Sequence, residues 1–179
     1  AGMFISLGTC SITNSAFVNN SSGSGFLDGS YGGALYISSG NTAITNTIFD
    51  NNAAINGAAI ACGGAGFNSS TITNCTFTNN TSSYAGTAFS GFAKATFKNC
   101  IFWNKAPTVS TIPGRDEIYS QETNSTNQPS FVNCIVRAAT GSPIVVVNTI
   151  MNNCLASNPL FNDLADADGG DNIFMTADD

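Results

Sequence analysis

The sequence lacks histidine altogether and has little charge: lysine, arginine, aspartate and glutamate make up 9% of its 179 residues, against about a quarter in ordinary soluble domains. Without histidine, the chain lacks the commonest general base in enzymes. Its few cations form no basic patch interleaved with aromatic residues, so we expect no nucleic-acid partner. No apolar run is long enough to span a bilayer as a helix.

The charge is unevenly distributed along the chain. Residues 1–113 contain three lysines and two aspartates, a net charge of +1, whereas the remaining residues contain two arginines and nine acids, a net charge of −7. The polar surface of the first part must therefore come mainly from asparagine, serine and threonine.

Two short motifs recur along the chain. The first reads ITNSAFVNN at 12–20, ITNTIFDNN at 44–52, ITNCTFTNN at 72–80, FKNCIFWNK at 97–105 and FVNCIV at 131–136, with an echo, IMNN, from Ile150. The second reads GGALYI at 32–37, GAAIAC at 57–62 and GTAFSG at 86–91, with a degenerate GMFIS at 2–6. Neither motif has helical spacing, and both are rich in residues that disfavour helices. Such units predict an all-β, right-handed parallel β-helix of about five or six coils over residues 1–160.

This fold predicts columns of equivalent side chains, because neighbouring coils lie about 4.8 Å apart. The inward column should contain Ile12, Ile44, Ile72, Phe97 and Phe131, beside a core stack of Phe17, Phe49, Phe77 and Phe102. An inward or corner ladder of amides should contain Asn14, Asn46, Asn74, Asn99 and Asn133. An antiparallel sandwich is the rival fold, but its strands would not share one consensus.

We interpret residues 1–179 as a single β-helix segment, processed or excised from a longer protein. Its parts are regular coils at 1–105, an inserted loop at 106–130, the last coils at 131–160 and an acidic C-terminal turn at 161–179. The inserted loop contains Arg115, Asp116 and Glu117, a local cluster that could bind a ligand or be a solvated loop tip. Trp103, at an outward position, is either a contact for a glycan or partner, or packs under the loop.

Three of the six cysteines, Cys75, Cys100 and Cys134, share one repeat position and should stack in adjacent coils. Cys154 looks offset from this position by one residue. We favour buried, reduced thiols over a disulfide, because the coil spacing exceeds the Cβ separation of a disulfide, about 3.8 Å. Zinc is disfavoured, because there is no histidine and no Cys-x-x-Cys pair.

The C-terminal acidic segment suggests a structural calcium site. Asp166, Asp168 and Asp171 surround two glycines, and hard oxygen ligands in a tight turn suit Ca²⁺. Six of the eleven acids lie in residues 163–179, so a solvated acidic tail is the equally weighted alternative.

The pair of motifs GGA[LIV] and FxxN resembles the repeat of the chlamydial polymorphic outer membrane proteins. Here it appears as Gly32-Gly33-Ala34-Leu35 and as Phe17…Asn20, Phe49…Asn52 and Phe77…Asn80, whereas Phe102 is followed by Lys105 where asparagine is expected. The C-terminal NPLFNDLADADGGDNIFMTADD is similar to the closing coil of choice-of-anchor type surface proteins. The resemblance implies a parallel β-helix that is secreted or on the bacterial cell surface, associated with the outer membrane and often adhesive.

The sequence leaves three functions open. The first is a non-catalytic structural or adhesin-like segment, whose partners would be host or matrix glycans or proteins, or other copies of the same assembly. The second is a polysaccharide lyase, a glycoside hydrolase or a glycan-binding β-helix with part of its site outside this segment. Against an enzyme, residues 1–113 contain only Asp28 and Asp50 as acids, at different repeat positions, whereas glycoside hydrolysis needs two positioned carboxyl groups. The third, an ice binder, is disfavoured because threonine does not persist at the outward positions.

Overall fold

In the computed structural model, more than half of the described residues form β-strands. The described residues are 1–23, 31–63, 69–91, 94–104, 117–121, 123–124, 126–137 and 149–156. Their strands are β1 (Met3–Ile5), β2 (Thr9–Val18), β3 (Leu35–Ile37), β4 (Asn41–Asp50), β5 (Ala53–Asn56), β6 (Ile60–Cys62), β7 (Ser69–Thr73), β8 (Thr76–Thr78), β9 (Thr81–Ala85), β10 (Phe89–Gly91), β11 (Lys94–Lys98), β12 (Ile101–Trp103), β13 (Ile118–Ser120), β14 (Ser130–Val132), β15 (Ile135–Val136) and β16 (Ile150–Asn152). Nothing in this part of the chain forms a helix suited to crossing a membrane.

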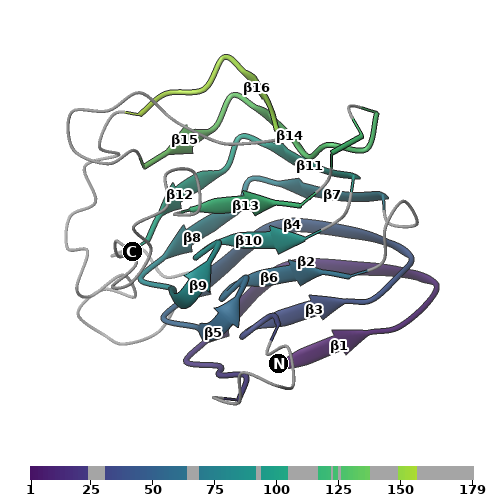
Figure 1. The fold of residues 1–179 in the computed structure, drawn as a ribbon, viewed down its shortest axis with the longest axis vertical. Helices are drawn as coiled ribbons and strands as arrows, with labels where there is room; N and C mark the ends of the chain where they lie inside the picture. Colours follow the sequence, from purple (N-terminus) through teal and green to yellow (C-terminus); the bar gives the residue numbers. More distant parts are fainter. Residues whose placement is uncertain are drawn as a thin grey trace.

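The strands pair in parallel and form three sheets that are the sides of a solenoid (Figure 1). Sheet A has the order β1-β3-β6-β10-β13, and sheet C pairs β5 with β9. Sheet B has the order β15-β12-β8-β4-β7-β11-β14-β16, with β2 also paired to β4. The chain visits sheets B, C and A in turn, for example through β4, β5 and β6, and then returns to sheet B.

These pairings confirm an all-β parallel solenoid and exclude the antiparallel sandwich. The number of turns differs from the five or six predicted, since the described residues support about three turns. Above these turns, β11 to β16 extend sheets A and B but add no strand to sheet C.

The predicted inward column is present in the register of sheet B. Ile12 pairs with Ile44, Ile44 with Ile72, Ile72 with Phe97, and Phe97 with Phe131. All five side chains are buried. The neighbouring phenylalanines stack face to face: ring centroids are 5.1 Å apart for Phe17 and Phe49, 4.9 Å for Phe49 and Phe77, and 4.7 Å for Phe77 and Phe102. The core is therefore a set of columns running along the solenoid.

The glycine motif forms the bend that leads into sheet A. Gly32, Gly57 and Gly86 have φ of 62°, 60° and 65°, a left-handed conformation that is costly for most side chains. The following position tolerates Gly33, Ala58 and Thr87, which explains why only the first glycine of the motif is constant.

Three details of the repeat differ from the prediction. In the last copy Met151, rather than Ile150, pairs with Phe131, so Cys154 is in line with Cys134 and the predicted offset is wrong. In the fourth copy, the motif predicts an asparagine three residues after Phe102, where Lys105 lies. In the structure Asn104, two residues after Phe102, fills this role instead. Finally, the range 106–130 is not one uninterrupted loop, because β13 within it pairs with β10 in sheet A.

Candidate functional site

A buried ladder of asparagine side chains runs through the interior and ends at a carboxyl group. The ladder consists of Asn20, Asn52 and Asn80, which end the first three copies of the first motif, and of Asn104, which precedes Lys105 in the fourth copy. In each step, the backbone N–H and the side-chain Nδ2 of one asparagine donate to the Oδ1 of the next. The distances are 3.0 and 3.0 Å from Asn20 to Asn52, 2.9 and 2.9 Å from Asn52 to Asn80, and 2.9 and 2.7 Å from Asn80 to Asn104.

Two of the buried amides also donate to a carbonyl group of the preceding turn. Nδ2 of Asn52 donates to the Phe17 carbonyl at 2.9 Å, and Nδ2 of Asn80 donates to the Phe49 carbonyl at 2.8 Å. Asn52 and Asn80 have no exposed surface. A buried amide without partners would be costly, so this ladder is what permits polar side chains inside the solenoid.

Glu117 is the terminal acceptor of this ladder. Its carboxylate accepts from the backbone N–H of Asn104 at 2.8 Å, from Nδ2 of Asn104 at 2.6 Å and from the Thr87 hydroxyl at 3.1 Å. Glu117 is 6% exposed, so the interpretation as a solvated loop tip is wrong for this residue. Its carboxylate occupies the position that the next asparagine of the ladder would fill.

Burial raises the pKa of Glu117 to about 7, although the hydrogen bonds from Asn104 and Thr87 and the charge of Arg137 oppose the shift. Of the described groups, Arg137 is the charged side chain that acts on this carboxyl. A carboxyl with a raised pKa can serve as a general acid, but Glu117 is enclosed and fully engaged with the ladder. We therefore assign it a structural role.

Trp103 lies beside this end of the ladder. It is half-buried on β12, and the guanidinium carbon of Arg137 lies 5.8 Å from its ring centroid. Arg137 also donates from Nη1 to the Asn104 carbonyl. The tryptophan is thus held by a cation–π contact, and part of its surface stays open to a partner.

The predicted ladder of Asn14, Asn46, Asn74, Asn99 and Asn133 lies at an exposed corner of sheet B, with φ of 47° to 53°. Amide hydrogen bonds join Asn46 to Asn14 at 3.2 Å, Asn74 to Asn46 at 3.3 Å and Asn99 to Asn74 at 3.3 Å. Asn153, missed from the sequence, continues the corner and donates to Asn133 at 2.7 Å.

Four cysteines each come one residue after an asparagine of this corner. Cys75, Cys100 and Cys134 are buried, Cys154 is half-buried, and all six cysteines are free. Ser15 and Thr47 occupy the same position in the first two copies, opposite each other in β2 and β4.

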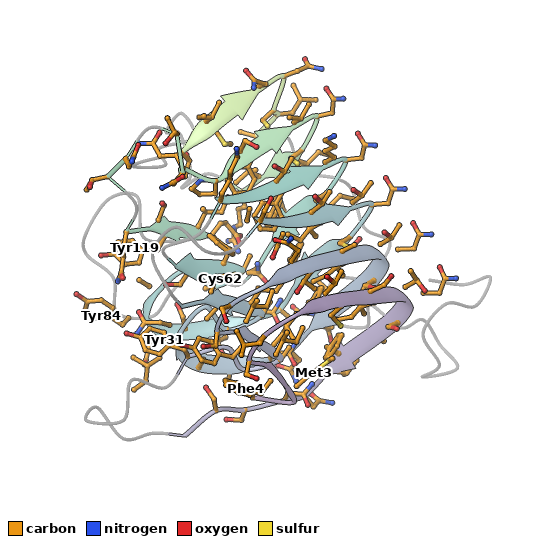
Figure 2. All side chains as sticks on the ribbon, turned by 90° about the vertical axis from the view of Figure 1, so that its right-hand side faces the viewer. Met3, Phe4, Tyr31, Cys62, Tyr84 and Tyr119 are labelled. Carbon is orange, nitrogen blue, oxygen red and sulfur yellow. The ribbon has the colours of Figure 1, made fainter. Side chains whose placement is uncertain are left out.

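An aromatic cluster lies on the outer face of sheet A. Phe4 pairs with Tyr36 in the register, and their ring centroids are 5.5 Å apart, while Tyr31 stacks on Tyr36 at 6.0 Å. Phe4 is 60% exposed and Tyr31 is 41% exposed. Tyr31, Tyr84 and Tyr119 lie along one edge of the molecule, with Phe4 on the lowest turn (Figure 2). We call Phe4, Tyr31 and Tyr36 the aromatic cluster.

Several predicted site residues lie outside the described residues. These are Arg115 and Asp116, and the calcium candidates Asp166, Asp168 and Asp171. Within the described ranges, no three or more histidine, cysteine, aspartate or glutamate side chains converge so as to hold one metal ion together.

Sequence reasoning found the repeat but missed the buried ladder and its end at Glu117. The signal was present in the second asparagine of each NN pair, which recurs while the residues around it vary. The link from Asn104 to Glu117 had no such signal, because the repeat stops there.

Comparisons with protein-family models, with curated proteins and with solved structures find no match to this chain.

Proposed function

We propose that this chain is a non-catalytic, structural or adhesin-like segment of a larger exported protein, secreted or held at the outer membrane surface of a bacterium. The observation that carries the proposal is the continuous interior: stacked phenylalanines and the buried asparagine ladder link successive turns without interruption. Such an interior favours a stiff rod that presents a surface. We further propose that the solenoid is right-handed.

The described carboxyl groups support the non-catalytic interpretation. Glu117 is enclosed in the ladder, and Asp50 accepts a hydrogen bond from Nδ2 of Asn79 at 3.0 Å. Neither is one of a pair facing a cleft, as hydrolysis of a glycosidic bond requires. A structural calcium ion at Asp166, Asp168 and Asp171 is part of the proposal.

A second candidate is a glycan-binding β-helix, and the aromatic cluster favours it. Exposed, uncharged rings offer flat apolar faces with polar tips, which suit partners that are partly apolar and partly hydroxylated. Host or matrix glycans and proteins, or other copies of the assembly, are the partners we propose for the segment. A lyase or hydrolase would need catalytic groups from outside the described residues.

The test immobilises the chain and measures both binding and turnover on a panel of acidic and neutral polysaccharides and matrix proteins. We expect binding without new reducing ends or unsaturated products. Tyr36→Ser should weaken binding about tenfold, since it removes the ring that joins Phe4 and Tyr31, while Tyr84→Ser is the matched control. Cleavage of any polysaccharide would contradict the non-catalytic proposal, and equal binding by both variants would exclude the aromatic cluster.

A further inference from the structure

The four thiols of the corner position form a column that runs along the solenoid. Thr73 pairs with Lys98, Lys98 with Val132, and Val132 with Asn152. Two residues after each of these lies a cysteine: Cys75, Cys100, Cys134 and Cys154. The strands that follow are also in register, through the pairs Thr76–Ile101, Ile101–Ile135 and Ile135–Leu155. The column is therefore fixed on both sides by strand pairing.

The four side chains adopt the same arrangement in each turn. Each Sγ lies near the carbonyl oxygen two residues earlier, at 3.3 Å for Cys75, 3.2 Å for Cys100, 3.4 Å for Cys134 and 3.5 Å for Cys154. Each also approaches a carbonyl oxygen of the preceding turn, at 3.9, 3.6, 3.7 and 3.5 Å in the same order. Because the surroundings repeat, the sulfur spacing follows the strand spacing of about 4.8 Å.

This sulfur–sulfur spacing is too long for a disulfide, but it is close to the span of two metal–sulfur bonds. Two metal–sulfur bonds of about 2.3 Å placed end to end span about 4.6 Å. Thiolate sulfur is the ligand that soft cations such as Cu(I) select. A linear two-coordinate ion therefore fits between two neighbouring sulfurs without moving the strands.

We propose that the thiol column binds soft monovalent cations, Cu(I) or Ag(I), in linear sites between the sulfurs of neighbouring turns. At one site two thiols release two protons to solvent and one cation enters, which leaves a net charge of −1 and transfers no electron. If three cations fill the column, four thiols release four protons and the net charge is again −1. Half-buried Cys154 is the entry to the column.

A thiolate is the form that binds a metal. The backbone carbonyl oxygens around each sulfur lose their thiol donor on deprotonation, and the cation replaces the proton as their positive partner.

The chain offers well-matched variants for the test. Ser15 and Thr47 fill the same position in the first turns, and their hydroxyls donate to the carbonyls of Thr13 and Thr45 in the same way. Cysteine-to-serine changes should therefore fold, which circular dichroism and thermal unfolding check. Cys100→Ser removes two of the three sulfur–sulfur intervals and leaves one. Cys75→Ser also removes one thiol but leaves two intervals.

The measurement is transfer of Cu(I) from its bicinchoninate complex to the reduced protein under anaerobic conditions, followed by the loss of the complex's visible absorbance. We expect the native chain to take up about three equivalents, Cys75→Ser about two, Cys100→Ser about one, and the variant with all four serines none. Cys10→Ser and Cys62→Ser, which change thiols outside the column, should match the native chain. Equal losses in Cys75→Ser and Cys100→Ser, uptake by the four-serine variant, or no uptake by the native chain would each overturn the proposal.

Discussion

The solenoid has two columns of asparagine, one at an exposed corner and one in the interior, and the side chain has a different role in each. At the exposed corner, Asn14, Asn46 and Asn74 have positive φ, and single amide hydrogen bonds of 3.2 and 3.3 Å link them. In the interior, Asn52 and Asn80 have no exposed surface, and each donates both to the next Oδ1 and to a carbonyl of the preceding turn.

The difference shows that the corner needs asparagine for its backbone, whereas the interior needs it for its hydrogen bonds. A left-handed conformation is tolerated by asparagine and glycine, and water can replace a corner amide bond. Nothing replaces a lost partner in the interior. Alanine should therefore be harmful in both columns, whereas glycine should be harmful only in the interior.

The largest effect is expected from Asn80→Ala. This change leaves the N–H and Nδ2 of Asn52 and the Phe49 carbonyl without the Asn80 side chain, while the Oδ1 of Asn104 keeps only the backbone N–H of residue 80. At about 1–3 kcal/mol for each unsatisfied buried group, we expect a loss of about 4 kcal/mol in the free energy of unfolding. Denaturant unfolding measures it. Asn80→Gly should be no better than alanine, and a loss below about 1 kcal/mol would show that the ladder contributes little.

A second expected effect depends on pH and tests the end of the interior ladder. The pKa of Glu117 is raised from 4.5 to about 7 in the folded chain, so between these values the folded state binds more protons than the unfolded state. Its contribution to stability is therefore fully present below pH 4.5 and is lost as pH rises to about 7. At 1.36 kcal/mol per unit, the change is about 3 kcal/mol.

The difference between native chain and Glu117→Gln isolates this contribution from that of the other acids. Denaturant unfolding at several pH values should show that the stability of the native chain relative to the variant decreases between pH 4.5 and 7. A difference that is constant across this range would contradict the raised pKa.

The smallest effect is expected at the exposed corner. Asn46→Ala forces a left-handed conformation on alanine, at about 1 kcal/mol, whereas Asn46→Gly should be nearly neutral because glycine adopts this conformation freely. Thermal unfolding of the two variants compares them directly. If glycine were as harmful as alanine, the amide ladder rather than the backbone would be the important feature of the corner.

The same distinction explains how much could be predicted from the sequence. Columns of Ile12, Ile44 and Ile72 follow from equal neighbours in a repeat, because parallel stacking makes equivalent residues adjacent. The class of fold and the inward column were therefore predictable. The corner role of Asn46 was only half predictable, since a sequence shows the residue but not its φ.

The features that could not be predicted from the sequence lie where the repeat becomes irregular or ends. Asn104 follows Phe102 by two residues rather than three, and Glu117 reaches it across a segment without a motif. Likewise, Cys154 belongs to its column only because Met151 pairs with Phe131. Such shifts of one residue are settled by packing and hydrogen bonding in three dimensions, which spacing along the chain does not encode.

The buried ladder also gives the solenoid a direction. From one ladder asparagine to the next, the N–H and Nδ2 donate to the Oδ1 of the following turn, so a whole turn that carries an equivalent asparagine can be inserted before Glu117 without creating a new unpaired group. The carboxylate has acceptors only, and a turn placed after it would find no amide donor from the ladder. The ladder can thus be lengthened before Glu117 in units of complete turns, and Glu117 ends it, although β14 to β16 continue sheet B beyond that point.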